Sequence, residues 1–159
     1  MGGTPDPPPM EADVLIDAEV PADQERLLEE ALAGLGVTAR TRVVPPRRGV
    51  TELSWLVLVS LPLQAFLSNV GGRLADDAYR ALRAVVRRLA HRDRPTPGAQ
   101  RPMVLRDVAT GLQVVLEPDL PDGAYRQLVA LDLSQFQFGP VHYDRHRSRW
   151  RSELDEAGG

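Results

Sequence analysis

The 159-residue chain contains no cysteine and no lysine. The absence of cysteine excludes disulfide bonds and thiolate nucleophiles, and it fits a reducing compartment. The absence of lysine excludes a Schiff-base enzyme and leaves no residue for the lysine of a Walker-type phosphate loop. Serine occurs several times, but never in the Gly-x-Ser-x-Gly pattern of a nucleophile elbow. This composition favours a protein that is not an enzyme and needs no cofactor.

Signals that would direct the chain to a membrane or out of the cell are also missing. The first nine residues carry neither a basic residue nor an apolar core, so they do not resemble a signal peptide. Asp6 stands where a myristoylation signal needs serine or threonine. The apolar region at residues 53–70 is interrupted by Pro62 and several polar residues, whereas a membrane span needs about 20 mainly apolar residues. We therefore expect a cytoplasmic protein without a membrane span.

The net charge of −3 hides an uneven distribution along the chain. Residues 1–36 contain nine acidic residues and one arginine, whereas residues 37–115 contain 13 arginines and five acidic residues. Because these charges nearly cancel over the whole chain, we do not expect a field that attracts nucleic acid. The oppositely charged segments can instead face each other within the fold or between copies, which favours a protein partner or self-association.

The first part of the chain shows a β-α-β pattern after a proline-rich tail at residues 1–11, which we expect to be disordered. Apolar residues alternate with acidic ones over residues 12–20, which predicts a half-buried strand. Leucine and alanine then recur at helical spacing between Pro21 and Gly36, residue types typical of a helix start and a helix stop. Residues 37–44 alternate again, so we expect the two strands to be parallel neighbours joined by a helix.

The middle of the chain leaves one element open. Residues 52–61 contain most of the longest apolar run of the sequence. As a strand this run ends at Ser60, and Pro62 opens the next helix. As a helix it begins at Thr51, an acceptable N-cap, and Pro62 kinks it. Residues 74–90 then place apolar residues on one side of a predicted helix and arginines on the other.

The rest of the chain predicts a hairpin, a short helix and an extension. Residues 104–108 and 112–117 read as two strands joined by a tight turn, and residues 124–131 as a short helix. Residues 134–159 form a C-terminal extension, in which β-forming residues around Gly139–Pro140 suit a β-hairpin packed on the edge of the domain.

This order of elements predicts a single α+β domain at residues 12–133. We expect two layers, with a small mixed sheet and the helices on one face. The apolar side of each element should meet in one core. The residues that we expect to be buried together are Ile16, Leu28, Leu32, Leu82, Val86 and Val114.

His142, Asp144 and His146 are the candidate metal ligands. In a strand they would project from the same face, and two imidazoles with a carboxylate can bind a metal ion that activates water. Such a site would make the chain a small metal-dependent hydrolase. The arginines around these residues disfavour a bound cation, so we expect an ordinary polar strand or loop without a metal.

The arginines at positions 145, 147, 149 and 151 alternate with other residues, including Trp150. A basic stripe with an aromatic side chain can follow a phosphate backbone. The same pattern is typical of a solvated edge strand, whose charges prevent pairing with another edge. Acidic residues nearby neutralise much of the stripe, so an arginine-mediated nucleic-acid binder is an alternative that we do not favour.

A second group of arginines lies on the predicted helix at residues 74–90. They should point to water while the apolar side of the helix packs on the sheet. The predicted first helix carries Asp23, Glu25, Glu29 and Glu30, so surfaces of opposite sign can attract each other in a salt-sensitive way, or both can be solvated helix faces. The candidate interaction surface comprises Arg80, Arg83, Arg87, Arg88, Arg145, Arg147, Arg149 and Trp150.

The order of elements resembles the small effector-associated constant component domains of bacterial conflict systems. The matching stretches are residues 13–44, the loop at residues 45–49, residues 52–89 with an interruption at Gly71–Gly72, and residues 103–131. The resemblance implies a non-catalytic adaptor that couples sensor and effector proteins through homotypic or heterotypic contacts in a defence or signalling assembly. It also implies that the segment around Trp55 is helical.

Overall fold

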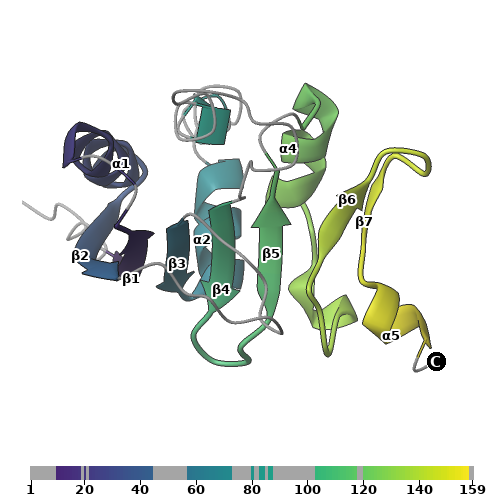
Figure 1. Ribbon diagram of the computed structural model, residues 1–159. Helices are drawn as coiled ribbons and strands as arrows, with labels where there is room; N and C mark the ends of the chain where they lie inside the picture. The colour runs from purple at the N-terminus through teal and green to yellow at the C-terminus, as the bar shows by residue number, and fades with distance from the viewer. Residues whose placement is uncertain are drawn as a thin grey trace, which may run out of the picture.

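Five strands form one mixed sheet in the computed structural model, and helices pack against it (Figure 1). The strands lie in the order β2 (Val37–Val44), β1 (Met10–Asp17), β3 (Val57–Leu61), β4 (Met103–Asp107) and β5 (Gln113–Leu116). A separate hairpin of β6 (His142–Asp144) and β7 (Arg149–Arg151) lies beside β5. The predicted α+β fold with a mixed sheet is therefore confirmed. The structure describes residues 10–18, 20, 22–44, 57–72, 80, 83–84, 86–87, 103–117 and 120–157.

The first unit is the predicted β-α-β unit. It consists of β1 (Met10–Asp17), α1 (Ala22–Gly34) and β2 (Val37–Val44), and the two strands pair in parallel along their whole length. β1 begins two residues earlier than expected, so Met10 and Glu11 belong to the strand and not to the tail. Gly36 lies after the helix with φ of 83°, a conformation that glycine adopts without strain, and it lets the chain turn into β2.

The apolar run in the middle of the chain forms strand β3 (Val57–Leu61), so the helix implied by the resemblance is wrong. β3 lies between β1 and β4, and its residues are buried on both faces of the sheet. A strand buried on both faces is a continuous apolar run, which periodicity cannot distinguish from a buried helix. Pro62 follows the strand and precedes α2 (Leu63–Gly72), as the strand alternative predicts, and α2 continues through Gly71–Gly72.

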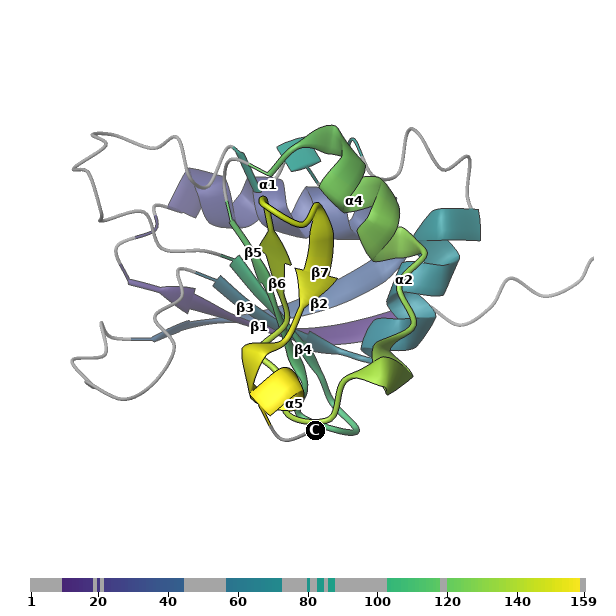
Figure 2. The ribbon, with the colours of Figure 1, turned by 90° about the vertical axis from the view of Figure 1, so that its right-hand side faces the viewer.

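The connections place the helices on one face of the sheet. The chain steps outward from β1 to β2 on one side, and outward from β3 to β4 (Met103–Asp107) on the other. β1 and β3 are antiparallel, so two right-handed crossovers in these directions put their helices on the same face. Figure 2 shows α1 and α4 (Asp122–Val129) on the same side of the sheet.

The main core forms between these helices and the sheet. The buried residues that we predicted to meet there do so, apart from Leu82, which lies outside the described residues. Most of the predicted helix at residues 74–90 also lies outside them, but residues 80, 83–84 and 86–87 are helical. The members of the core that confirm the prediction are Ile16, Leu28, Leu32, Val86 and Val114.

The opposite face of the sheet carries a small second cluster and charged residues. Leu58, Val104 and Val115 are buried together, with partly buried Leu15 packed against them, and these four residues are direct cross-strand neighbours. Beside this row, Asp13 and Arg106 are exposed. We call this the open face, because the described helices of the core pack on the other face.

The hairpin of β4 and β5 (Gln113–Leu116) is tied to the start of α2 by Asp107. One carboxylate oxygen accepts from the backbone N–H of Leu63 at 3.1 Å, and the other accepts from the hydroxyl of Thr110 at 2.8 Å. Burial raises the pKa of Asp107, but the hydrogen bonds from Thr110 and Leu63 outweigh it and hold the pKa below its usual range. One side chain therefore serves both as a helix cap and as the organiser of a turn.

The chain ends in the predicted short helix and an extension. Helix α4 (Asp122–Val129) begins two residues earlier than expected, and a single 3-10 turn (Leu133–Gln135) follows it. The hairpin consists of β6 (His142–Asp144) and β7 (Arg149–Arg151), and helix α5 (Glu153–Ala157) comes last. The turn of the β6-β7 hairpin lies at residues 145–148 and not at the predicted Gly139–Pro140, which instead lead into the hairpin.

Candidate interaction surface

Trp150 fixes the C-terminal hairpin to the domain. Its side chain is only 5% exposed, its ring meets Tyr143 edge-on with centroids 5.6 Å apart, and its indole N–H donates to the carbonyl of Ala124 in α4 at 2.9 Å. Val141 adds two backbone hydrogen bonds to β5 at 2.8 and 2.9 Å. The placement of Trp150 on an exposed interaction surface is therefore wrong, because the indole belongs to the core.

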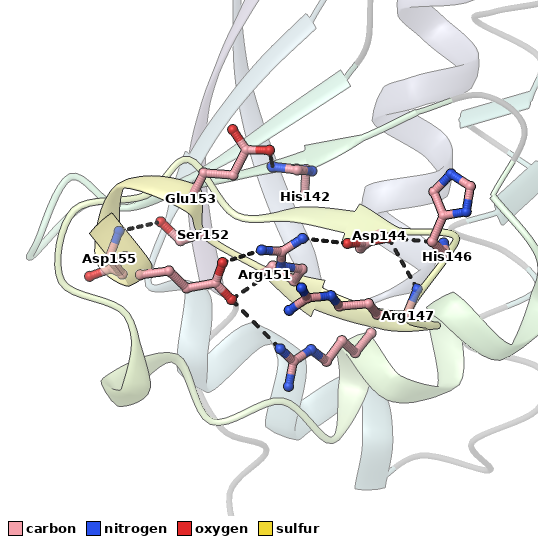
Figure 3. Close-up of polar contacts among 10 residues, drawn as sticks. His142, Asp144, His146, Arg147, Arg151, Ser152, Glu153 and Asp155 are labelled. Atoms are coloured by element: carbon pink, nitrogen blue, oxygen red, sulfur yellow. Dashed lines mark hydrogen bonds and ion pairs between the residues drawn. The ribbon is translucent and has the colours of Figure 1, made fainter. Parts of the chain in front are cut away.

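The three candidate metal ligands do not come together (Figure 3). Asp144 accepts from Arg151 at 2.5 Å and from the backbone N–H groups of His146 and Arg147 at 2.9 and 3.1 Å. His146 lies in the turn after β6, so it does not share a strand face with His142, whose imidazole lies 3.9 Å from a carboxylate oxygen of Glu153. The hypothesis of a metal-dependent hydrolase required these three side chains on one strand face, and the structure does not place them there.

The arginine series of the hairpin is not a continuous stripe. Arg145 and Arg147 lie in the turn, and only Arg149 and Arg151 belong to a strand. Arg149 lies 3.7 Å from a carboxylate oxygen of Glu156, and Arg145 lies 3.9 Å from one of Glu117. Most of these arginines therefore have an acidic neighbour. The alternative of a phosphate-binding stripe is weakened, because the predicted regular spacing is interrupted by the turn.

A carboxylate near the C-terminus holds the loop that precedes the hairpin. Asp155 in α5 accepts from the backbone N–H groups of Gln137 at 2.7 Å, Phe138 at 3.1 Å and Gly139 at 3.1 Å. Gly139 has φ of 60°, and a Cβ atom there would come within 2.9 Å of a Leu112 methyl group, so any other residue would be strained at this position. Nothing in the local sequence pattern points to this contact, because its partners are 16 to 18 residues apart.

The hairpin should loosen in acid. The Arg151 side chain first, and then the backbone of Arg147, lower the pKa of Asp144 to about 2, and the Ser152 hydroxyl with the backbone of residues 137–139 lowers the pKa of Asp155 to about 2. Both carboxyls are harder to protonate in the folded chain, so their stabilisation is complete above about pH 4 and is lost as the pH falls to about 2.

We therefore expect Asp155→Asn to be less stable than the parent at pH 6, with the difference shrinking as the pH falls to about 2. Urea unfolding followed by circular dichroism at several pH values measures this. Glu30→Gln, a change at an exposed residue of α1, is the matched control and should leave stability nearly unchanged at all of these pH values. A difference for Asp155→Asn that stays constant with pH would contradict the assignment.

The helical arginines are only partly free. Arg83 pairs with Asp122, the first residue of α4, and its side chain is 24% exposed. Arg80 and Arg87 are exposed, as expected, while Arg88 lies outside the described residues. Arg83 therefore contacts α4 through Asp122. The hairpin turn contacts the same helix through its backbone, because the Gln127 amide donates to the carbonyl of Ser148 at 3.0 Å.

Strand β2 is a candidate surface that the sequence did not single out. It is the outermost strand, and within the described residues no strand pairs with its outer edge (Figure 1). Arg40 and Arg42 are both exposed, on the open face of the sheet. The alternation of these arginines with other residues was visible in the sequence, but only the strand order reveals that this strand has a free edge.

Comparisons with protein-family models, with curated proteins and with solved structures find no match for this chain. Among the described helices, none is both long enough and apolar enough to cross a membrane.

Proposed function

We propose that the chain is a non-catalytic protein-interaction module that takes up an extended segment of its partner at the outer edge of β2. The observation that carries this proposal is the position of an eight-residue strand at the edge of the sheet. An unpaired strand edge offers backbone donors and acceptors to another chain, which is how β-strand addition works in peptide-binding domains.

The backbone of β2 has a defined outward side. The carbonyls of Gly36 and Val44 accept from the N–H groups of Met10 at 3.2 Å and Ala18 at 2.9 Å, so these two carbonyls face β1. Backbone groups alternate in direction along a strand, so every second residue between them also faces β1. The residues whose N–H and C=O groups face outward are Val37, Ala39, Thr41 and Val43.

The edge has little of the protection that isolated strand edges usually have. Many edge strands avoid pairing with other chains because they are very short or contain proline, but β2 has eight residues and no proline. Val43 is 55% exposed at an outward-facing backbone position, so an added strand would cover an apolar side chain. The charged residues of β2 are Arg40 and Arg42, which discourage pairing with a basic strand. They therefore select a partner by its charge.

The biological setting follows from the resemblance in element order. We place the module in the cytoplasm, as an adaptor in a bacterial defence or signalling assembly. The genes next to its own test this setting, because sensor and effector genes of such a system would support it. Neighbours that form a metabolic operon would argue against it.

Selection on the full chain tests the proposed function. The probe is a phage-displayed library of random linear peptides long enough to span β2. Peptides that are enriched should bind the parent and Val43→Thr alike, and they should bind Val43→Pro about tenfold or more weakly, because proline removes the outward N–H and obstructs the edge. Val43→Thr is the matched control, since it keeps the N–H and the branched shape.

The folding of Val43→Pro is checked by circular dichroism and thermal unfolding. Thr41→Pro, compared with Thr41→Val, is a second matched pair, because both changes lose the hydrogen bond from the Thr41 hydroxyl to Glu29 at 2.8 Å and only one loses the backbone N–H. Enriched peptides that bind both proline variants as tightly as the parent, or a library from which nothing is enriched, would overturn the proposal.

A further inference from the structure

We infer that the partner strand carries acidic side chains at alternate positions, on the open face beside Arg40 and Arg42, and uncharged side chains on the helix side. This inference rests on the proposed function and names the chemistry of the partner. Cross-strand neighbours on one face interact directly, so the side chains of β2 dictate what an added strand can present.

The two arginines on the open face of β2 have different neighbours on β1. Arg40 is in register with Asp13 and lies 3.9 Å from Glu11, so β1 already supplies it with carboxylates. Arg42 is in register with Leu15, and no carboxylate of the described residues is paired with it. A carboxylate on a strand outside β2 would lie beside both guanidinium groups, and Arg42 would gain the partner that β1 does not provide.

The helix side of β2 has the opposite preference. The hydroxyl of Thr41 donates to Glu29 of α1, and Glu30 next to it is also exposed. A second carboxylate brought to this side would be repelled, whereas the exposed Val43 favours an apolar neighbour. An added strand therefore needs acidic and uncharged residues in strict alternation, because side chains of a strand alternate between the two faces.

Strand β1 already shows this pattern on the inner side of β2. Its open-face residues Glu11 and Asp13 are acidic and exposed, while Ala12 and Val14 are buried in the main core. Over residues 11–14 the inner neighbour of β2 thus has the alternation that we infer for the outer one, whereas the apolar Leu15 takes the next open-face position. The partner strand would repeat on the outer edge the charge pairing that β1 makes on the inner edge.

A second copy of β2 does not meet this requirement. Two copies related by a two-fold axis perpendicular to the sheet would pair antiparallel, with their open faces on the same side. Residues directly opposite each other then point to the same face, so open-face residues of one copy oppose open-face residues of the other. In the central registers, Arg40 or Arg42 of one copy then opposes Arg40 or Arg42 of the other. Like charges directly opposite each other destabilise a strand pair, so the edge selects a different, acidic strand over its own copy.

Synthetic peptides test the inference by titration against the full chain. The first peptide alternates glutamate with valine, the second has the same composition with the glutamates and valines in separate blocks, and the third replaces each glutamate of the first by lysine. We expect the alternating acidic peptide to bind more tightly than either of the others, and its affinity to fall as salt is raised.

Charge reversal identifies the residue responsible. Arg42→Glu should weaken binding of the alternating acidic peptide by about two- to thirty-fold, since an attraction becomes a repulsion. Arg106→Glu is the matched control, because Arg106 is an exposed arginine on the open face but belongs to β4, away from the edge. It should leave the affinity nearly unchanged, and Val43→Pro should weaken it as in the library experiment.

The possible results separate the two proposals. If the acidic and lysine peptides bind equally and both are weakened by Val43→Pro, the edge function stands and the acidic partner is overturned. Equal binding of the alternating and blocked peptides, or equal losses in Arg42→Glu and Arg106→Glu, would also overturn the acidic partner. Binding of the acidic peptide that is unaffected by Val43→Pro would count against both proposals, because the edge would not be the site.

Discussion

Replacing Trp150 by alanine should destabilise the folded chain by about 3–5 kcal/mol, the usual cost of removing a large buried aromatic side chain. The indole packs against Tyr143 and donates to the carbonyl of Ala124, so its loss leaves a cavity and a buried acceptor without its donor. Urea unfolding followed by far-ultraviolet circular dichroism measures the change through the shift in midpoint.

Two further variants separate packing from other effects. Trp150→Phe keeps an aromatic ring but loses the N–H, and it should cost less than the alanine variant. Arg149→Ala changes the exposed residue next to it on β7 and should alter stability by about 0.5 kcal/mol or less. A loss below about 1 kcal/mol for Trp150→Ala would mean that the hairpin is not an integral part of the domain.

Replacing Tyr125 by phenylalanine should stabilise the chain, by about 1–3 kcal/mol. Tyr125 of α4 is fully buried, and its hydroxyl oxygen has no hydrogen-bond partner among the residues that the structure describes. A buried polar group without a partner costs roughly this amount, so phenylalanine removes a penalty while it keeps the ring. Thermal and urea unfolding of the two proteins measure the gain. Tyr143→Phe is the comparison, because the Tyr143 hydroxyl is not among the fully buried, unpartnered polar atoms of the described residues.

The same substitution has a second signature in alkali. Burial raises the pKa of Tyr125 to about 12, although the charges of Arg87 and Arg83 act in the opposite direction. The phenol is therefore harder to ionise in the folded chain than in the unfolded chain, so the free energy of unfolding falls as the pH rises from about 10 to about 12. Tyr125→Phe should lack this part of the alkaline loss, and a variant less stable than the parent at pH 7 would show that the hydroxyl has a partner.

Periodicity predicted the elements whose two sides differ. β1, α1 and β2 were expected from alternation and helical spacing, because each of them has a wet side and a buried side. β3 was ambiguous because it is the central strand and is buried on both faces. The resemblance then favoured the wrong alternative there, since an overall order of elements carries no information on which neighbours surround one apolar run.

The candidate surface was harder to predict than the fold. Arg80 and Arg87 are exposed as expected, because charged residues on the polar side of a helix remain in water. Trp150 was misplaced because its hydrogen-bond partner in α4, Ala124, is 26 residues away, and an aromatic residue between arginines has the same local pattern in a core as on a surface. The pairing of Arg83 with Asp122 spans 39 residues and left no local signal for the same reason.

By itself, the sequence determined most of the elements of this protein, the α+β class and five of the residues of its core. These follow from the alternation of polar and apolar residues within a few positions, and from the proline and glycine residues that begin and end helices. Only the tertiary structure decided that β2 is an edge strand, that Asp107 caps a helix 44 residues away and that Asp155 holds the loop before the hairpin. Strand order and long-range hydrogen bonds depend on how the elements pack together, and packing brings together residues that are too far apart in the chain to share a pattern.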